Sequence, residues 1–372
     1  MRQTTLLLIV TVLLGCNGTM HSASTSGAAA EVRAVPSDAG GDAVATPADA
    51  EPPRRVGQGA TASPTAPVPQ ESSAELLQRT SDVLITGTLA VRGTEVGVVM
   101  DSIEDPSRPR QIGSSVLPGS VNGLALVRDG LVAAGCGAEG IFLIDLAGRV
   151  PGLRVGLLDT AGAVWRLERL GDHVLAADGH LGVMVADLRD PAHPLVVGRW
   201  RSQGYVMHAV AHGPDLVLVA EGRSGLAVLD ISDPSAPRLL GRLDTDGEAR
   251  SVASRDDVAF VADFHHGVVS ADVSDPASPR LLGRLDTTES ARDVEVLGQY
   301  VAVAIGRDGV AIVDASDPSA MTLAARYPTS ASAVRITAHG TRLFVAADSG
   351  GMDVIDVADP RSPRPVLAAR GR

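Results

Sequence analysis

The stretch GLAVLDISDPSAPRLLGRLDT, residues 225–245, decides the fold because residues 267–287 repeat it closely as GVVSADVSDPASPRLLGRLDT. The aspartate of an Asp-Pro step marks six copies, at Asp105, Asp190, Asp233, Asp275, Asp317 and Asp359. The last four intervals are 43, 42, 42 and 42 residues, and the interval of 85 before them leaves room for one degenerate copy at Gly148. A period of about 42 residues with four short apolar runs is typical of a blade of a β-propeller. The sequence therefore predicts an all-β, seven-bladed β-propeller.

One copy shows the predicted strands. In the fifth copy they span residues 250–254, 258–263, 267–273 and 280–285, and the Asp-Pro turn joins the last two. The two middle strands are almost continuously apolar, which indicates sheets packed on both faces. A second aspartate closes the third strand in six copies, and we interpret it as a turn cap because a group repeated in six blades is not a catalytic one. These residues are Asp145, Asp187, Asp230, Asp272, Asp314 and Asp356.

The third strand resembles the bacterial and archaeal LVIVD-repeat family, seen here as Ala227-Val228-Leu229-Asp230 and as residues 352–356, MDVID. The resemblance covers about residues 80–372 and implies a propeller in an exported protein, without implying an activity. The second copy departs from the pattern because residues 148–151, GRVP, replace the Asp-Pro turn. First strands start near Thr80 and fourth strands end near Ala369, so we expect no blade to combine strands from both chain ends. Residues 74–77 are a weaker candidate for an extra strand.

The N-terminus predicts that the protein is exported and anchored to a membrane. Residues 1–15 have a charged start and a nine-residue apolar run, Leu6 to Leu14. This run is too short for a membrane helix, which needs about 20 residues, and it is typical of an export signal. Residues 13–16, LLGC, resemble the bacterial lipobox, which implies that Cys16 carries acyl chains such as palmitate. An ordinary secretory signal is the alternative. By the same resemblance, Asn17 favours the outer membrane over inner-membrane retention.

Composition separates a tether from the propeller and excludes several functions. Residues 16–78 are rich in Ala, Ser, Thr, Gly and Pro, so we expect a disordered linker before a propeller at residues 79–372. The net charge of −12 argues against nucleic acid as a partner. All 32 basic residues are arginine, which excludes lysine chemistry. We predict no cofactor, and we expect a lone, unreactive thiol at Cys136.

The candidate site lies where the repeat is broken. Loops between second and third strands, and between blades, share one rim, which the sequence predicts to be acidic, with Asp178, Glu221, Asp263, Asp308 and Asp348 among its residues. The residue 17 positions before each third-strand glycine forms a predicted column at the channel mouth: Thr80, Gly123, Trp165, His208, Arg250, Arg292 and Val334. A one-residue insertion is assigned between Arg199 and Val210, a stretch that holds Trp200, Gln203, Gly204 and Tyr205.

Six of these residues are predicted to bind a ligand: Trp165, Trp200, Tyr205, His208, Arg250 and Arg292. Their side chains suit an anion or a peptide carboxylate, and the alternative is a solvated channel lining without a ligand. The pair His265 and His266 with Asp263 could hold a metal, but neighbouring histidines point apart, so no metal site is predicted. There is no nucleophile elbow and no His-Glu-x-x-His motif.

These observations favour a lipid-anchored envelope protein, at the outer membrane, whose propeller binds or scaffolds an envelope or extracellular protein or peptide. We do not expect an enzyme. One alternative is an enzyme or small-anion-binding protein that uses the channel mouth, and another is a purely structural envelope protein.

Overall fold

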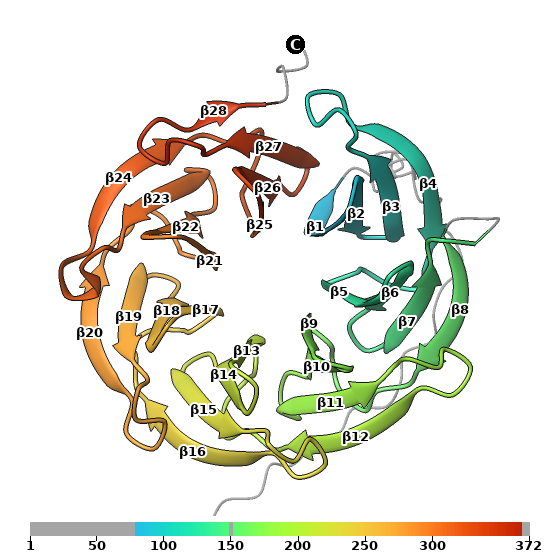
Figure 1. Ribbon diagram of the computed structural model, residues 1–372, viewed down its shortest axis with the longest axis horizontal. Helices are drawn as coiled ribbons and strands as arrows, with labels where there is room; N and C mark the ends of the chain where they lie inside the picture. Colours follow the sequence, from blue (N-terminus) through green and yellow to red (C-terminus); the bar gives the residue numbers. More distant parts are fainter. Residues whose placement is uncertain (1–78, 149–151, 367–372) are drawn as a thin grey trace, which may run out of the picture. The chain divides into compact units, whose positions relative to one another are not determined.

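Seven four-stranded antiparallel sheets stand around a central axis in the computed structural model, which describes residues 79–148 and 152–366 (Figure 1). Each sheet consists of four consecutive strands, so blade one is β1 to β4 and blade seven is β25 to β28. The predicted all-β seven-bladed propeller is confirmed, and a single 3-10 turn, Pro318–Ala320, is the one helical element of the described ranges. The predicted signal peptide, Cys16, the linker and the possible strand at residues 74–77 lie outside them.

The first strands of the blades lie nearest the axis and the fourth strands form the outer wall. In chain order the strands are β1 (Thr80–Thr86), β2 (Leu89–Thr94), β3 (Gly97–Ser102), β4 (Arg110–Val116), β5 (Gly123–Arg128), β6 (Leu131–Gly135), β7 (Ile141–Asp145), β8 (Leu153–Leu158), β9 (Arg166–Leu170), β10 (His173–Ala177), β11 (Val183–Asp187), β12 (Leu195–Trp200), β13 (His208–His212), β14 (Leu216–Ala220), β15 (Leu226–Asp230), β16 (Arg238–Leu243), β17 (Ser251–Arg255), β18 (Val258–Ala262), β19 (Val268–Asp272), β20 (Arg280–Leu285), β21 (Asp293–Leu297), β22 (Tyr300–Ala304), β23 (Val310–Asp314), β24 (Thr322–Tyr327), β25 (Arg335–His339), β26 (Arg342–Ala346), β27 (Met352–Asp356) and β28 (Arg364–Pro365).

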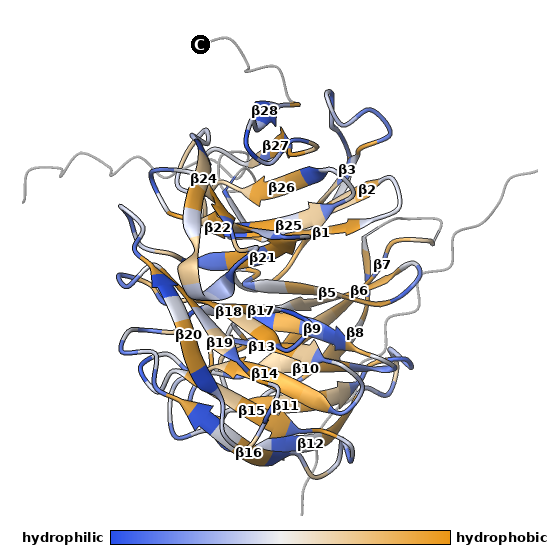
Figure 2. Ribbon diagram, turned by 60° about the vertical axis from the view of Figure 1, so that its left-hand side comes forward, coloured by the Kyte–Doolittle hydropathy of each residue, from blue (hydrophilic) through white to orange (hydrophobic). Residues whose placement is uncertain are grey.

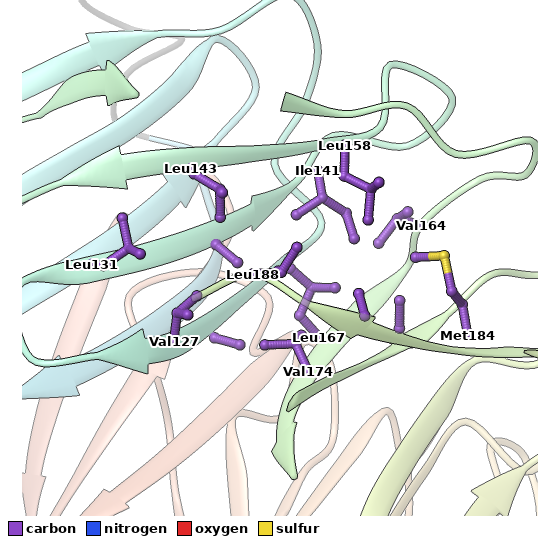
Figure 3. Packing of buried hydrophobic residues seen from close by; sticks show 14 residues of the cluster. Val127, Leu131, Ile141, Leu143, Leu158, Val164, Leu167, Val174, Met184 and Leu188 are labelled. Atoms are coloured by element: carbon purple, nitrogen blue, oxygen red, sulfur yellow. The ribbon is translucent and has the colours of Figure 1, made fainter. Parts of the chain in front are cut away.

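The core lies between neighbouring blades. The second and third strands are buried on both faces, and their colour in Figure 2 is mostly hydrophobic, whereas the turns are mostly hydrophilic. Figure 3 shows the layer between blades two and three, where Leu131, Ile141 and Leu143 of one sheet pack against Leu167 and Met184 of the next. Burial of such side chains contributes about 1.5–3 kcal/mol each. Strands that are apolar on both faces therefore require a blade on either side.

The two repeated aspartates fix the turns between third and fourth strands. Asp230 Oδ1 accepts a hydrogen bond from the Ser232 amide at 2.9 Å, and Asp233 Oδ1 accepts one from the Ser235 amide at 2.9 Å. Blades three, five, six and seven repeat both bonds, blade one has only that of Asp105, and blade two has only that of Asp145. The prediction that these acids are turn caps is confirmed.

A glycine starts the third strand because the backbone there is left-handed. Gly225 has φ +77° and Gly267 φ +73°, a region that favours glycine. A Cβ atom on Gly225 would also lie 2.2 Å from the Leu243 carbonyl oxygen, and one on Gly267 would lie 2.2 Å from that of Leu285. The repeated glycine is therefore required both by conformation and by the close approach of the fourth strand.

The ring closes between blades seven and one without exchange of strands. The Thr80 amide donates to the Asp348 carbonyl at 2.9 Å, and Thr337 Oγ1 donates to the Val83 carbonyl at 2.6 Å. Six buried apolar residues form the core of this seam, against eleven to fourteen in each of the other interblade clusters among the described residues. Among the strands that the structure describes, no blade combines both chain ends, as expected. We call this closure the seam.

Candidate functional site

The mouth of the channel holds a cavity of about 250 Å³. Each blade contributes the residue at or just before the start of its first strand, so the cavity meets seven different side chains: Ser81, Asn122, Trp165, Met207, Arg250, Arg292 and Val334. Arg79, Thr80, Glu95, Arg335 and Asp348 complete the lining. We call this site the mouth cavity, and the rim around it the mouth rim. The opposite rim, which carries the Asp-Pro turns, is the Asp-Pro rim.

The structure places Thr80, Trp165, Arg250, Arg292 and Val334 in the lining of the mouth cavity, as the column predicts, but it corrects the column in two blades. Asn122 and Met207 line the cavity in place of Gly123 and His208, and Ser81 lines it beside Thr80. In blade two a β-bulge between Leu126 and Arg128 adds a residue, so a count back from the third strand misses by one.

The insertion in blade four is also placed incorrectly by the sequence prediction. Trp200 and Val206, at the ends of the link from blade three to blade four, are six positions apart. Leu243 and Ala249, at the ends of the link from blade four to blade five, are separated by the same six positions. The extra residue lies instead in the turn between β13 and β14, residues 213–215, where other blades use two residues. Trp200 is buried, 8% exposed, in the core between blades three and four, with the Arg242 guanidinium 5.5 Å from its ring centroid. It does not face the mouth cavity.

Tyr205 lies at the mouth rim and fixes the aromatic wall of the cavity. The Trp165 Nε1–H donates to the Tyr205 hydroxyl, and the two ring centroids are 5.9 Å apart in an edge-on arrangement. The His180 ring meets the other side of Tyr205 at 4.5 Å. Three side chains from two blades thus hold one another, and the indole is positioned before any ligand arrives.

Arg250 is held in a similar way on the other side of the mouth. Its Nη2 contacts Glu248 Oε1 at 2.7 Å, and its guanidinium lies 3.5 Å from the Phe264 ring centroid. Stacking and the ion pair together set the direction of this side chain.

A buried polar layer lies one residue deeper than the mouth cavity, and sequence reasoning missed it. Arg166 of blade three reaches across the axis to Asp293 of blade six, and its Nη1 donates to Ser251 of blade five at 3.0 Å. Asp293 also accepts from the Ile336 amide at 2.9 Å. Burial alone would raise the pKa of Asp293, but the charges of Arg166 and Arg335 lower it below its ordinary value. This layer joins blades three, five, six and seven beneath the mouth cavity.

His208 belongs to this layer. It is 3% exposed, and its Nδ1 accepts from the Val252 amide at 3.2 Å, which places its proton on Nε2. Burial, together with Arg166 and Arg335, holds its pKa well below the usual range, so the ring is neutral. Its Nε2 has no hydrogen-bond partner among the described residues.

Ser251, His208 and Asp293 resemble a hydrolytic triad in composition but not in order. The Ser251 hydroxyl lies 2.5 Å from Asp293 Oδ1 and 3.2 Å from His208 Nδ1, so the serine stands between the acid and the base. A catalytic triad needs the histidine between them, so that it can take the serine proton while the acid holds its other nitrogen. The three side chains therefore do not have the order of a Ser-His-Asp triad.

Two glutamates, Glu168 and Glu295, lie two residues further along their first strands than Arg166 and Asp293. Burial raises the pKa of Glu168 to about 7 and that of Glu295 to about 7, and the nearby Asp293 adds to the second shift. Both carboxyls are therefore partly protonated near neutral pH.

The predicted acidic rim is corrected in part. Asp178, Glu221 and Asp263 are fully buried, because arginines of the fourth strands and a threonine cover them. Arg199 contacts Asp178 at 2.8 Å, Arg242 contacts Glu221 at 2.8 Å, and Thr245 donates to Asp263 at 2.7 Å. The exposed acids of the mouth rim are Glu139, Asp159, Asp244, Asp246, Asp286, Glu289, Asp308 and Asp348.

The histidine pair does not converge with Asp263. The His266 Nδ1 lies 3.9 Å from Asp263 Oδ2, whereas His265 contacts the Ser290 hydroxyl at 2.9 Å. Within the part of the chain that the structure describes, no group of three metal-binding side chains is found. Cys136 is buried, and burial together with Glu139 raises the pKa of its thiol to about 12.

The comparisons support the fold and the repeat. Four segments match the LVIVD repeat model, residues 211–245, 246–287, 289–329 and 331–368, which fall in blades four to seven. No curated protein matches the sequence. In the described ranges no helix is long and apolar enough to cross a membrane.

Solved propellers are similar in fold alone. The β-propeller domain of Cps50 (Swd1) from Myceliophteria thermophila is 15% identical, with a TM-score of 0.62 over 75% of this chain and 97% of that one. The WD40 β-propeller domain of Doa1 is 14% identical, with a TM-score of 0.63 over 76% and 94%. The computationally designed Ika8 protein is 13% identical, with a TM-score of 0.58 over 75% and 83%.

Proposed function

We propose that this protein is a cell-envelope lipoprotein whose propeller binds or scaffolds a protein or peptide partner through the mouth rim, without catalysis. The observation that carries the proposal is the convergence on one cavity of seven side chains of six kinds, one from each blade. Specific recognition needs such unlike groups, with Trp, Tyr and Arg as common anchors. Propellers of this kind commonly present their rims to proteins.

The Asp-Pro rim is less suited than the mouth rim to the binding of a specific partner. Its turns repeat the same aspartate-to-amide hydrogen bonds from blade to blade. A partner that meets it finds little to distinguish one blade from the next. The fixed Trp165–Tyr205–His180 cluster and the stacked Arg250 have no such repetition.

Charge supports a partner with a basic surface. The mouth rim exposes eight carboxylates, from Glu139 to Asp348. Complementary charge speeds encounter and suppresses wrong partners. The same acids, with the net charge of −12, disfavour nucleic acid.

The order of Ser251, His208 and Asp293 supports a non-catalytic role, since the histidine does not stand between the serine and the acid as it does in a catalytic triad.

The binding role is tested by capture of partners from an envelope extract. Arg250→Ala and Tyr205→Ala should each weaken capture by more than about 1 kcal/mol, or about fivefold in Kd, with the melting temperature nearly unchanged. Arg238→Ala and Arg280→Ala are matched controls on the Asp-Pro rim, because both side chains are 71% exposed. Loss of binding in the controls with none in the mouth variants would show that the Asp-Pro rim is the binding face.

The anchor is tested separately. Mass spectrometry of the mature protein should find acyl chains on Cys16, and Cys16→Ser should leave soluble protein or uncut precursor. A mature, unmodified N-terminus at another residue would end the lipoprotein proposal while leaving the binding role open.

A further inference from the structure

Not every arginine of the mouth cavity forms an ion pair with a carboxylate. Four line it, Arg79, Arg250, Arg292 and Arg335, against two acids, Glu95 and Asp348. Arg79 pairs with Glu95 at 3.0 Å, and Arg250 pairs with Glu248 at 2.7 Å. Asp348 forms no ion pair with either remaining arginine, whereas such pairs are frequent elsewhere in the described ranges. The mouth cavity therefore keeps two guanidinium groups without a carboxylate bound to them.

Arg292 shows this most directly. Its Nε is buried and has no hydrogen-bond acceptor among the described residues. A buried donor left without an acceptor is costly, so such donors are rare unless water or a ligand provides the acceptor. The buried His208 Nε2 is in the same condition, in the layer directly beneath.

Arg335 is the second guanidinium, and it connects the cavity to the layer below. Burial and the charge of Arg166 lower its pKa to about 10, while Asp293 and Asp82 act in the opposite direction. The two acids are already engaged, Asp293 by Arg166 and Asp82 by the Leu124 amide at 2.8 Å. An additional negative charge above Arg335 would relieve the loss of its hydration.

The lining also has an apolar part, beside the polar Thr80, Ser81 and Asn122. Trp165, Met207 and Val334 are contributed by blades three, four and seven, and the indole is fixed by Tyr205. The cavity is smaller than the roughly 300–1,000 Å³ typical of sites for drug-sized ligands, so it suits one residue-sized group. A group with one negative end and one apolar body matches both parts of the lining.

We infer that the mouth cavity binds a single carboxylate on a residue-sized apolar stem, with Arg292 and Arg335 at the carboxylate and Trp165, Met207 and Val334 around the stem. Guanidinium–carboxylate pairs give strong, directional hydrogen bonds. Two sources share this chemistry, a free small carboxylic acid and the C-terminal residue of a peptide. The inference rests on the proposed binding role of the mouth rim, and it names the group that enters it.

The test uses calorimetry on the purified full chain with N-acetylphenylalanine and its C-terminal amide as probes. The acid should bind at least tenfold more tightly than the amide, and Arg292→Gln should reduce acid binding at least tenfold. Val334→Trp should block the cavity without removing a charge. Arg280→Gln, on the Asp-Pro rim, should change nothing. Circular dichroism melts confirm that each variant is folded.

Several outcomes would overturn the inference. These are equal binding of acid and amide, unchanged binding in both Arg292→Gln and Val334→Trp, or no acid binding at millimolar concentration together with none by a peptide with a free C-terminus.

A peptide ending in phenylalanine separates the two sources. If the peptide binds at least tenfold more tightly than the acetylated amino acid, and C-terminal amidation abolishes the gain, the site takes a C-terminus. Equal affinities assign it to a small acid, and both results uphold the carboxylate site.

Failure of this inference is distinguishable from failure of the proposed function. Partner capture that survives in Arg292→Gln but is lost in Arg250→Ala and Tyr205→Ala would keep the binding face and remove the carboxylate from it.

Discussion

At the scale of the residue, the most consequential side chains are charged groups inside the channel. Arg166 is 11% exposed and Asp293 is fully buried, and their contact joins blades that are 127 residues apart in the chain. Removal of one partner of a buried ion pair leaves an uncompensated charge, which costs far more than loss of a surface pair.

We therefore predict that Asp293→Leu lowers the free energy of unfolding by about 3–5 kcal/mol in urea titrations. Adding Arg166→Met should recover much of the loss, because the second change removes the stranded charge. Asp172→Ala, which deletes the exposed partner of Arg189, should change stability by less than about 1 kcal/mol. If the double variant is as unstable as Asp293→Leu, the charge is not the cause.

Glu168 and Glu295 predict a dependence of stability on pH. Their folded-state pKa values, raised to about 7 by burial, exceed the ordinary 4.5, so the native state holds protons that the unfolded chain has released. Stability should fall as pH rises from about 4.5 to 7, by up to about 3 kcal/mol for each carboxyl, and then level off. Urea titrations across this window should show a clearly shallower fall in Glu168→Gln/Glu295→Gln. An identical fall in wild type and variant would assign the effect to other groups.

Sequence predicted the mouth cavity better than the layer beneath it. Trp165, Arg250 and Arg292 stand out as large, unlike residues in an otherwise regular repeat. Arg166, Ser251 and Asp293 follow directly after three column positions, but their pairing depends on which blades face each other across the axis. The one available signal was a polar residue at the start of apolar first strands in several blades.

At the scale of the element, the repeat predicts strand limits well. In blade five the structure places strands at Ser251–Arg255, Val258–Ala262, Val268–Asp272 and Arg280–Leu285, within one or two residues of the prediction. The sequence prediction misplaced the inserted residue of blade four because Trp200 and Tyr205 differ in residue type from the other copies of the repeat. Spacing alone, compared with blade five, places the extra residue in the turn at residues 213–215.

Two glycines allow the cost of a steric clash to be separated from the cost of a left-handed backbone when glycine is replaced by alanine. Gly213 has φ +70° with open space where a Cβ would stand, so Gly213→Ala should cost about 1–2 kcal/mol. Gly225 has a similar φ of +77°, and its Cβ would also collide with the Leu243 carbonyl, so Gly225→Ala should cost clearly more in urea titrations. Equal losses would mean that the fourth strand moves aside freely.

At the scale of the whole molecule, the period predicted the number of blades, and the positions of the first and last strands predicted closure without strand exchange. The strength of that closure could not be predicted, because it depends on which side chains of blades one and seven meet. In the described ranges the seam has the smallest buried apolar cluster of the ring.

The seam is therefore predicted to open before any other interblade contact. Equivalent backbone hydrogen bonds allow a direct test by amide exchange: Thr80 to Asp348 crosses the seam, whereas Ala249 to Gly222 and Ala291 to Phe264 cross other interfaces. The Thr80 amide should exchange faster than those of Ala249 and Ala291, because local opening follows sparse apolar contact. Equal protection of the three amides would mean that the ring opens only as a unit.

Because each blade is built from contiguous sequence, the blades can form one after another during synthesis. Each sheet uses four consecutive strands, so a chain that emerges from its N-terminal end can complete one blade before the next is made. The mouth cavity is completed only when the last blade forms, since Val334 and Arg335 belong to the last blade and Thr80 and Ser81 to the first. An unfinished chain therefore has most of its propeller but no complete cavity. The ability to hold a ligand there reports that synthesis has reached the end of the ring.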